Sequence, residues 1–151
     1  MPTPKPKSDE DILGVEYDWL ASDAAGHVAF FSTAGGGYAP SEFLRDTEAH
    51  DRAIDAILET GPSTKSLFSP QLPPALKNTW RMMAERGLFA FDSDAHRAPY
   101  LLAAAPENPI QIDDLPKNAS EVVRLLNFPS LRFSELKVVP KELLKPSDPG
   151  N

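Results

Sequence analysis

The stretch VEYDWLASDAAGHVAFFST, residues 15–33, decides the fold of this 151-residue chain. Apolar and polar side chains alternate along its first half, with Tyr17 and Trp19 on the same side, which is the period of a β-strand. A turn that contains a glycine follows, because glycine adopts a positive φ at no steric cost. The second half is again rich in strand-forming residues. The stretch therefore predicts a β-hairpin over 15–22 and 27–33.

Further elements follow from helical spacing and from the glycines and prolines that interrupt it. The spacing predicts helices near 41–45, 47–60, 75–86 and 118–127. Alternation and strand-forming residues predict strands over 88–91, 99–105 and 131–139, of which the first two form a second hairpin. We therefore predict an α+β fold, with an antiparallel sheet built from two hairpins plus a C-terminal strand and with helices on one side. Both tryptophans, Trp19 and Trp80, are predicted to lie in the core.

The ends of the chain differ in composition from its middle. Residues 1–10 and 145–151 combine prolines with polar and charged residues, so we expect disordered tails there and a single domain over 11–144. The absence of cysteine excludes a disulfide scaffold and a thiol nucleophile. Because no apolar run has the length of a secretory signal or a membrane span, we expect a cytoplasmic protein without a membrane partner.

Acidic residues outnumber basic ones by 22 to 15, which gives a net charge of −7. This balance argues against nucleic acid as a partner, since a protein that binds phosphates needs Lys and Arg. Within the predicted helix 47–60, the acidic residues Glu48, Asp51, Asp55 and Glu59 are spaced by three, four and four positions and form one longitudinal stripe. The stripe is either a solvated helix face or a surface that binds a basic protein.

Three glycines follow the first hairpin, and a predicted helix begins shortly after them. The backbone amides of Gly35, Gly36 and Gly37 are therefore candidates for an anion-binding loop. A phosphate-binding loop also carries a Gly-Lys-Ser or Gly-Lys-Thr sequence, which is missing here. A tightly turned connector is the alternative interpretation.

Two acidic segments are candidates for metal binding or acid–base chemistry. Asp92, Asp94 and His96 alternate, so an extended backbone presents all three on one face as potential metal ligands. Asp and Ser also favour turns, and this segment lies where the second hairpin must turn. Asp113 and Asp114 form an acidic pair that suits either acid–base catalysis or a helix cap. We predict no metal site, no cofactor and no catalytic residue.

Three parts of the chain together resemble a known group of proteins: residues 17–37, residues 86–92 with 99–103, and residues 109–116 with 131–133. The first part carries the pattern D-W-x-A-x-D-x-x-G-x-x-A-x-F. The group consists of small bacterial cytoplasmic proteins that are similar to immunity proteins of bacterial toxin systems.

The resemblance implies a non-enzymatic, protein-binding domain that neutralises a cognate toxin by covering its active site. The acidic charge favours a basic toxin, such as a nuclease. The alternative is a small-ligand or anion-binding protein, or an enzyme, that uses the 32–37 loop and the 92–96 turn.

Overall fold

The computed structural model describes residues 6–68, 79–94, 96 and 99–144. Its strands are β1 (Asp18–Asp23), β2 (Val28–Ser32), β3 (Ser66–Phe68), β4 (Phe89–Asp92), β5 (Tyr100–Pro106), β6 (Asn127–Phe128) and β7 (Val138–Val139). Its α-helices are α1 (Asp9–Ile12), α2 (Ser41–Arg45), α3 (Thr47–Glu59), α4 (Thr79–Ala84) and α5 (Lys117–Leu125). The described residues also include the short 3-10 helices η2 (Ile112–Asp114), η3 (Phe133–Glu135) and η4 (Lys141–Leu143).

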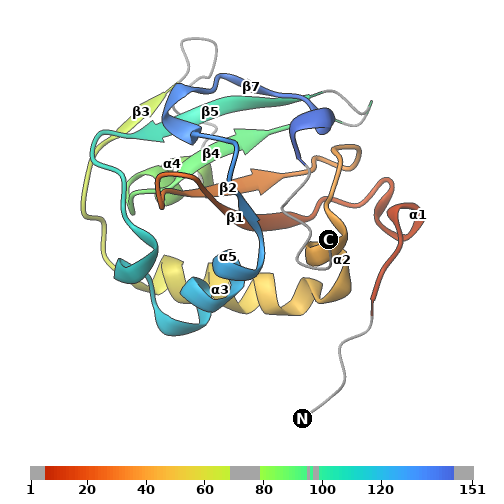
Figure 1. The fold of residues 1–151 in the computed structure, drawn as a ribbon, viewed down its shortest axis with the longest axis horizontal. Helices are drawn as coiled ribbons and strands as arrows, with labels where there is room; N and C mark the ends of the chain where they lie inside the picture. The colour runs from red at the N-terminus through yellow and green to blue at the C-terminus, as the bar shows by residue number, and fades with distance from the viewer. Residues whose placement is uncertain (1–5, 69–78, 95, 97–98, 145–151) are drawn as a thin grey trace.

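The strands form one mixed sheet in the order β3-β5-β4-β2-β1-β6, and β7 pairs with β5 (Figure 1). Both predicted hairpins are confirmed, because β1 pairs antiparallel with β2 and β4 pairs antiparallel with β5. The α+β class is confirmed as well. The prediction of a purely antiparallel sheet is wrong, since β2 runs parallel to β4 and β1 runs parallel to β6.

The parallel pairing arises where the two hairpins meet. The chain leaves β2, passes through α2, α3, β3 and α4, and re-enters the sheet as β4 beside β2. A connection that contains helices brings the chain back to the end of the sheet from which β2 started, so the next strand runs in the same direction. The ends of β2 and β4 therefore lie at one edge of the sheet, with Ser32 opposite Asp92.

The predicted C-terminal strand over 131–139 is reduced to its last two residues. Leu131 and Phe133 alternate as in a strand, but both are buried against the sheet face, and η3 replaces the extended backbone. Only Val138 and Val139 pair with β5. The segment therefore covers one face of the sheet, and only its last two residues add to the sheet as a strand.

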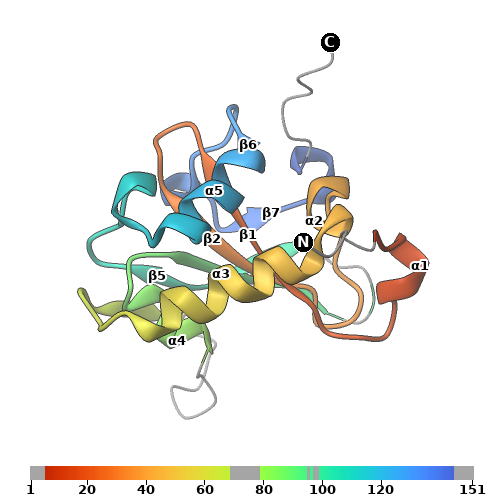
Figure 2. The ribbon, with the colours of Figure 1, turned by 90° about the horizontal axis from the view of Figure 1, so that it is seen from below.

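Two apolar clusters lie on the two faces of the sheet. Leu20, Phe30 and Ala90 point into the first cluster, which α3, α4 and α5 cover. Figure 1 shows α3 and α5 on one side of the strands, and Figure 2, seen from that side, shows α3 between α4 and α5. The second cluster receives Ile12, two residues of α2 and the chain from 126 to 144. The helices on one side are thus α3, α4 and α5, whereas α2 contributes to the opposite cluster.

Stacked aromatic rings form the centre of the second cluster. Trp19 stacks on Phe31 with ring centroids 4.0 Å apart, and Phe31 stacks on Phe91 at 5.1 Å. These three residues are register partners on the neighbouring strands β1, β2 and β4. Tyr100 meets both Trp19 and Phe31 edge-on, and its hydroxyl accepts a hydrogen bond from the Trp19 Nε1–H at 3.1 Å.

Two buried polar side chains accept hydrogen bonds from backbone amides in and beside β1. His50 of α3 accepts a hydrogen bond from the Leu20 amide at its Nδ1, at 3.0 Å. Burial lowers the pKa of His50 to about 4, so the imidazole is neutral and free to accept. Asp23 accepts from the amides of Ala25 and His27 in the hairpin turn and from the Phe133 amide at 2.7 Å. Asp23 therefore links the first hairpin to the segment 131–139, which we call the C-terminal cover.

The predicted helices near 41–45, 47–60 and 118–127 correspond to α2, α3 and α5. Residues 75–78 of the helix predicted over 75–86 lie outside the described residues, as do residues 1–5 and 145–151 of the predicted tails. Of the other N-terminal residues, Ser8 caps α1, and the Lys7 amide donates to the Leu44 carbonyl at 2.8 Å. No helix in the described part of the chain is long and apolar enough to cross a membrane.

We expect Trp19→Ala to lower the free energy of unfolding by about 3–5 kcal/mol, because it removes a fully buried indole and leaves a cavity in the aromatic centre. Urea unfolding followed by circular dichroism measures the loss. Trp80→Ala is the matched control. Trp80 is only half-buried at the edge of the first cluster, so its loss is expected to be smaller. Equal losses in the two variants would contradict the central place of Trp19.

Candidate functional site

The four acidic residues predicted to form a stripe lie on α3 as their spacing indicates. Glu48, Asp51, Asp55 and Glu59 are all exposed, and we call them the α3 stripe. None of the ion pairs within the described residues involves a member of the stripe. Burial, followed by the charges of Asp55 and Glu48, raises the pKa of Asp51. The carboxylates therefore repel one another, and the charges of Lys7 and Arg52 offset this repulsion at Asp51 only in part.

A second acidic group lies at the sheet edge where β2 and β4 end. Asp18, Ser32 and Asp92 are register partners on three neighbouring strands, so their side chains share one face of the sheet. The Ser32 hydroxyl donates to Glu16 Oε1 at 2.9 Å. We call Glu16, Asp18 and Asp92 the edge carboxylates. The sequence does not reveal that these residues are neighbours, because their arrangement depends on the pairing of β2 with β4.

Burial raises the pKa of both Asp18 and Asp92 to about 6, and neighbouring acids add to the shift. Glu16 contributes to both, and Asp51 of the α3 stripe acts on Asp18. Asp18 Oδ1 is buried without a hydrogen-bond partner among the described residues. Asp18 and Asp92 are thus able to hold a proton up to about pH 6, and Asp51 couples Asp18 electrostatically to the α3 stripe.

The glycine loop does not offer its amides to a ligand. The amides of Gly36 and Gly37 both donate to the Thr33 carbonyl, at 3.0 and 2.8 Å. The Gly35 amide donates to Thr33 Oγ1 at 3.3 Å. Positive φ angles at Ala34 (51°) and Gly35 (92°) turn the backbone inward to make these bonds. The three amides predicted to bind an anion therefore close the loop on itself, which favours the connector interpretation.

The same loop lines a pocket of about 520 Å³. The pocket lies between the end of α1, the loop after β2, the beginning of β5 and η4, which gather at one end of the sheet (Figure 1). Tyr100 lines it and is otherwise buried. The glycine loop is recognisable in the sequence, but the pocket is not, because no sequence pattern marks α1 or η4.

The 92–96 segment is not assembled as a metal site. Asp92 is half-buried at the end of β4, whereas Asp94 and His96 are exposed, and Asp94 Oδ1 accepts from the His96 amide at 2.7 Å. Among the residues that the structure describes, no three His, Asp or Glu side chains are grouped so as to hold a metal ion.

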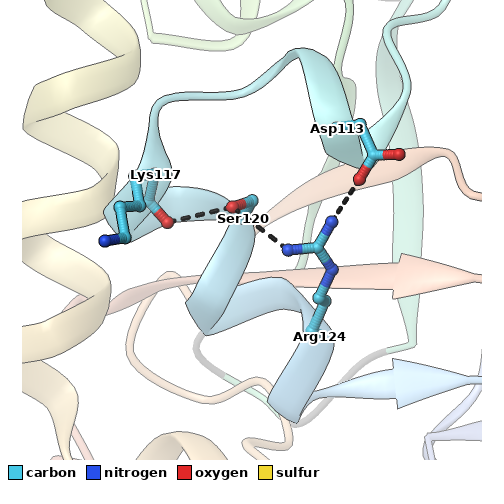
Figure 3. Close-up of polar contacts among 4 residues, drawn as sticks. All are labelled: Asp113, Lys117, Ser120 and Arg124. Atoms are coloured by element: carbon cyan, nitrogen blue, oxygen red, sulfur yellow. Dashed lines mark hydrogen bonds and ion pairs between the residues drawn. The ribbon is translucent and has the colours of Figure 1, made fainter.

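Asp113 serves a structural purpose. Its carboxylate pairs with the Arg124 guanidinium and so holds η2 against α5 (Figure 3). Arg124 Nη1 also approaches Ser120 Oγ at 3.5 Å, and that hydroxyl donates to the Lys117 carbonyl at 2.9 Å. Asp113 and Asp114 lie within η2, and neither η2 nor α5 has a side-chain hydrogen bond at its N-cap, so the acidic pair does not form the predicted helix cap.

Comparisons of the chain with protein-family models, with curated proteins and with solved structures find no match.

The raised pKa values of Asp18 and Asp92 predict that the stability of the fold depends on pH. The folded state holds protons on Asp18 and Asp92 up to about pH 6, whereas the unfolded chain releases them near the ordinary pKa of 3.8. These groups therefore destabilise the protein increasingly as the pH rises from about 4 through 6. We expect Asp18→Asn or Asp92→Asn to stabilise the fold at pH 7.5 by about 1 kcal/mol, after solvent screening is allowed for.

The advantage of either variant over the parent is expected to shrink between pH 6 and pH 4. Urea unfolding at several pH values measures it, and the comparison with the parent cancels the opposite contribution of His50. Asp114→Asn, at an exposed position, is the matched control. An advantage that does not change with pH would contradict the assignment.

Proposed function

We propose that this chain is a non-enzymatic protein-binding domain that docks on a basic protein through the α3 stripe. The single observation that carries the proposal is the exposure of all four stripe carboxylates on one helix without an ion pair in the described part of the chain. Like charges in this arrangement destabilise an isolated helix. A basic surface placed against them removes that repulsion, so association is favoured.

The edge carboxylates enlarge the proposed surface. Asp51 and Asp18 interact electrostatically, which links the stripe on α3 to the row at the sheet edge. A charge field of one sign over two elements steers an oppositely charged protein and raises its association rate. It also discriminates against acidic proteins, since like charges across an interface are costly.

The partner that suits this surface best is a basic toxin, as the resemblance to immunity proteins implies. An enzyme that acts on nucleic acid carries Lys and Arg to bind phosphates. An acidic domain that covers those residues competes with the nucleic acid. In this proposal the domain needs no catalytic residue, because neutralisation results from occupying the partner's surface.

We expect the double variant Asp51→Lys, Asp55→Lys to remain folded, because both side chains are exposed and their mutual repulsion is relieved. Association with the partner is expected to slow at least tenfold, and the remaining association is expected to depend less on salt. Pull-downs from the native host, with the captured proteins identified by mass spectrometry, compare the variant with the parent.

The matched control is Glu107→Lys, Glu135→Lys, which changes the net charge by the same amount at exposed positions outside α3. Glu135 does pair with Arg132, but the two side chains are 3.8 Å apart and both are exposed, so that pair contributes little to stability. The proposal predicts that the parent and the control capture the same basic protein and that the stripe variant does not. Co-expression of the captured protein with the parent then tests whether its toxicity is neutralised. Equal capture by all three proteins would refute the role of the α3 stripe.

A further inference from the structure

We infer that the pocket beside the glycine loop binds a small, uncharged, mostly hydrocarbon molecule. The inference is independent of the proposed protein partner, which concerns α3 and the adjoining edge carboxylates. A volume of about 520 Å³ lies within the range of about 300–1,000 Å³ that is usual for small-molecule sites. The class of ligand follows from the rigidity of the walls, from their hydrogen bonds and from the residues at the mouth.

The walls of the pocket are fixed by bonds to the core. The Tyr100 hydroxyl donates to the Tyr38 carbonyl at 2.7 Å and accepts from Trp19 Nε1 at 3.1 Å. On the other side, the Gly14 amide donates to the Gly35 carbonyl at 2.8 Å and ties the end of α1 to the glycine loop. A pocket held in this way is largely formed before a ligand arrives, so binding costs little ordering of the protein.

The polar groups of the walls are already engaged with one another. The amides of Gly35, Gly36 and Gly37 donate to Thr33, and the Tyr100 hydroxyl both donates and accepts within the protein. These groups offer no donors to a phosphate or carboxylate, which needs several of them when it leaves water. A charged ligand would therefore lose hydration without compensation from these groups.

The charges at the pocket cancel. Lys141 and Glu142 are adjacent on η4, have opposite signs and are both exposed. They select for neither an anion nor a cation. An uncharged ligand meets no electrostatic penalty at this mouth.

Large exposed apolar side chains line or adjoin the pocket. Leu13 is 45% exposed and Tyr38 is 36% exposed, and both line the pocket. Leu143, next to the lining residue Glu142, is 39% exposed. Water contacts hydrocarbon surface at each of them, and a hydrocarbon ligand that covers this surface binds through the hydrophobic effect. Apolar walls with internally satisfied polar groups thus define the ligand class.

The test uses two probes with the same ring system. N-phenyl-1-naphthylamine is uncharged, whereas 8-anilinonaphthalene-1-sulfonate carries a sulfonate on the same frame. We expect saturable, one-site fluorescence enhancement with the uncharged probe and at least tenfold weaker binding of the sulfonate. The uncharged probe is also expected to raise the melting temperature of the full chain by mass action, a measurement that requires no variant.

Leu13→Asp places a charge at the mouth and is expected to weaken binding of the uncharged probe at least tenfold. Leu125→Asp, at a 78% exposed position on α5, is the matched control and is expected to bind like the parent. Binding of the sulfonate as tight as that of the uncharged probe would overturn the ligand class. An absence of saturable binding, or equal binding by the Leu13→Asp variant, would overturn the site itself. None of these outcomes bears on the α3 stripe, because the probes require no protein partner.

Discussion

The stacking of Trp19 on Phe31, and of Phe31 on Phe91, sets the position of most other parts of the molecule. Because the three rings are register partners, a slip of one residue between any two strands would turn one ring to the opposite face of the sheet. Rings from four further segments then pack against this stack: Phe43, Tyr100, Phe128 and Phe133. They bring α2, β5, β6 and the C-terminal cover to the same place. The candidate sites adjoin this stack. Asp18 and Asp92 are the sequence neighbours of Trp19 and Phe91, and the glycine loop follows Phe31 by a few residues. Tyr100, in the pocket wall, packs on Phe31 itself.

Local patterns were sufficient to predict the hairpins and most helices, and insufficient to predict how the hairpins meet. Alternation around Trp19 and Phe31 marks strands, and Gly26, with its φ of 77°, marks the turn between them. The parallel pairing of β2 with β4 depends on the path of the intervening helices, and no short stretch of sequence determines that path. The segment with Leu131 and Phe133 has the alternation of a strand, but its residues are buried by packing on a face and not by pairing at an edge. Two-residue strands such as β6 leave no pattern to detect.

The candidate sites also differ in how far local sequence patterns predict them. The α3 stripe lies on one helix, so spacing alone placed its four carboxylates on one face. The edge carboxylates Asp18 and Asp92 come from strands far apart in the sequence, and only the register through Ser32 makes them neighbours. The glycine loop was recognised from composition, but composition does not reveal the direction of its amides, which point to Thr33. The predicted anion site and the observed pocket therefore share residues and differ in chemistry.

His50 has a consequence for how this protein behaves in a crowded solution. β6 pairs with β1 only at Ser22 and Asp23, so the amide of Leu20 would otherwise be an unpaired donor on the stretch of β1 that β6 does not cover. Exposed strand edges are templates on which further chains add and aggregate. The neutral imidazole of His50, a residue of α3, accepts from this amide and closes the open stretch of β1 with a side chain in place of a strand. Since burial lowers the pKa of His50 to about 4, the imidazole accepts this hydrogen bond down to about that pH, and the closure is lost below it, where protonation converts the acceptor into a donor.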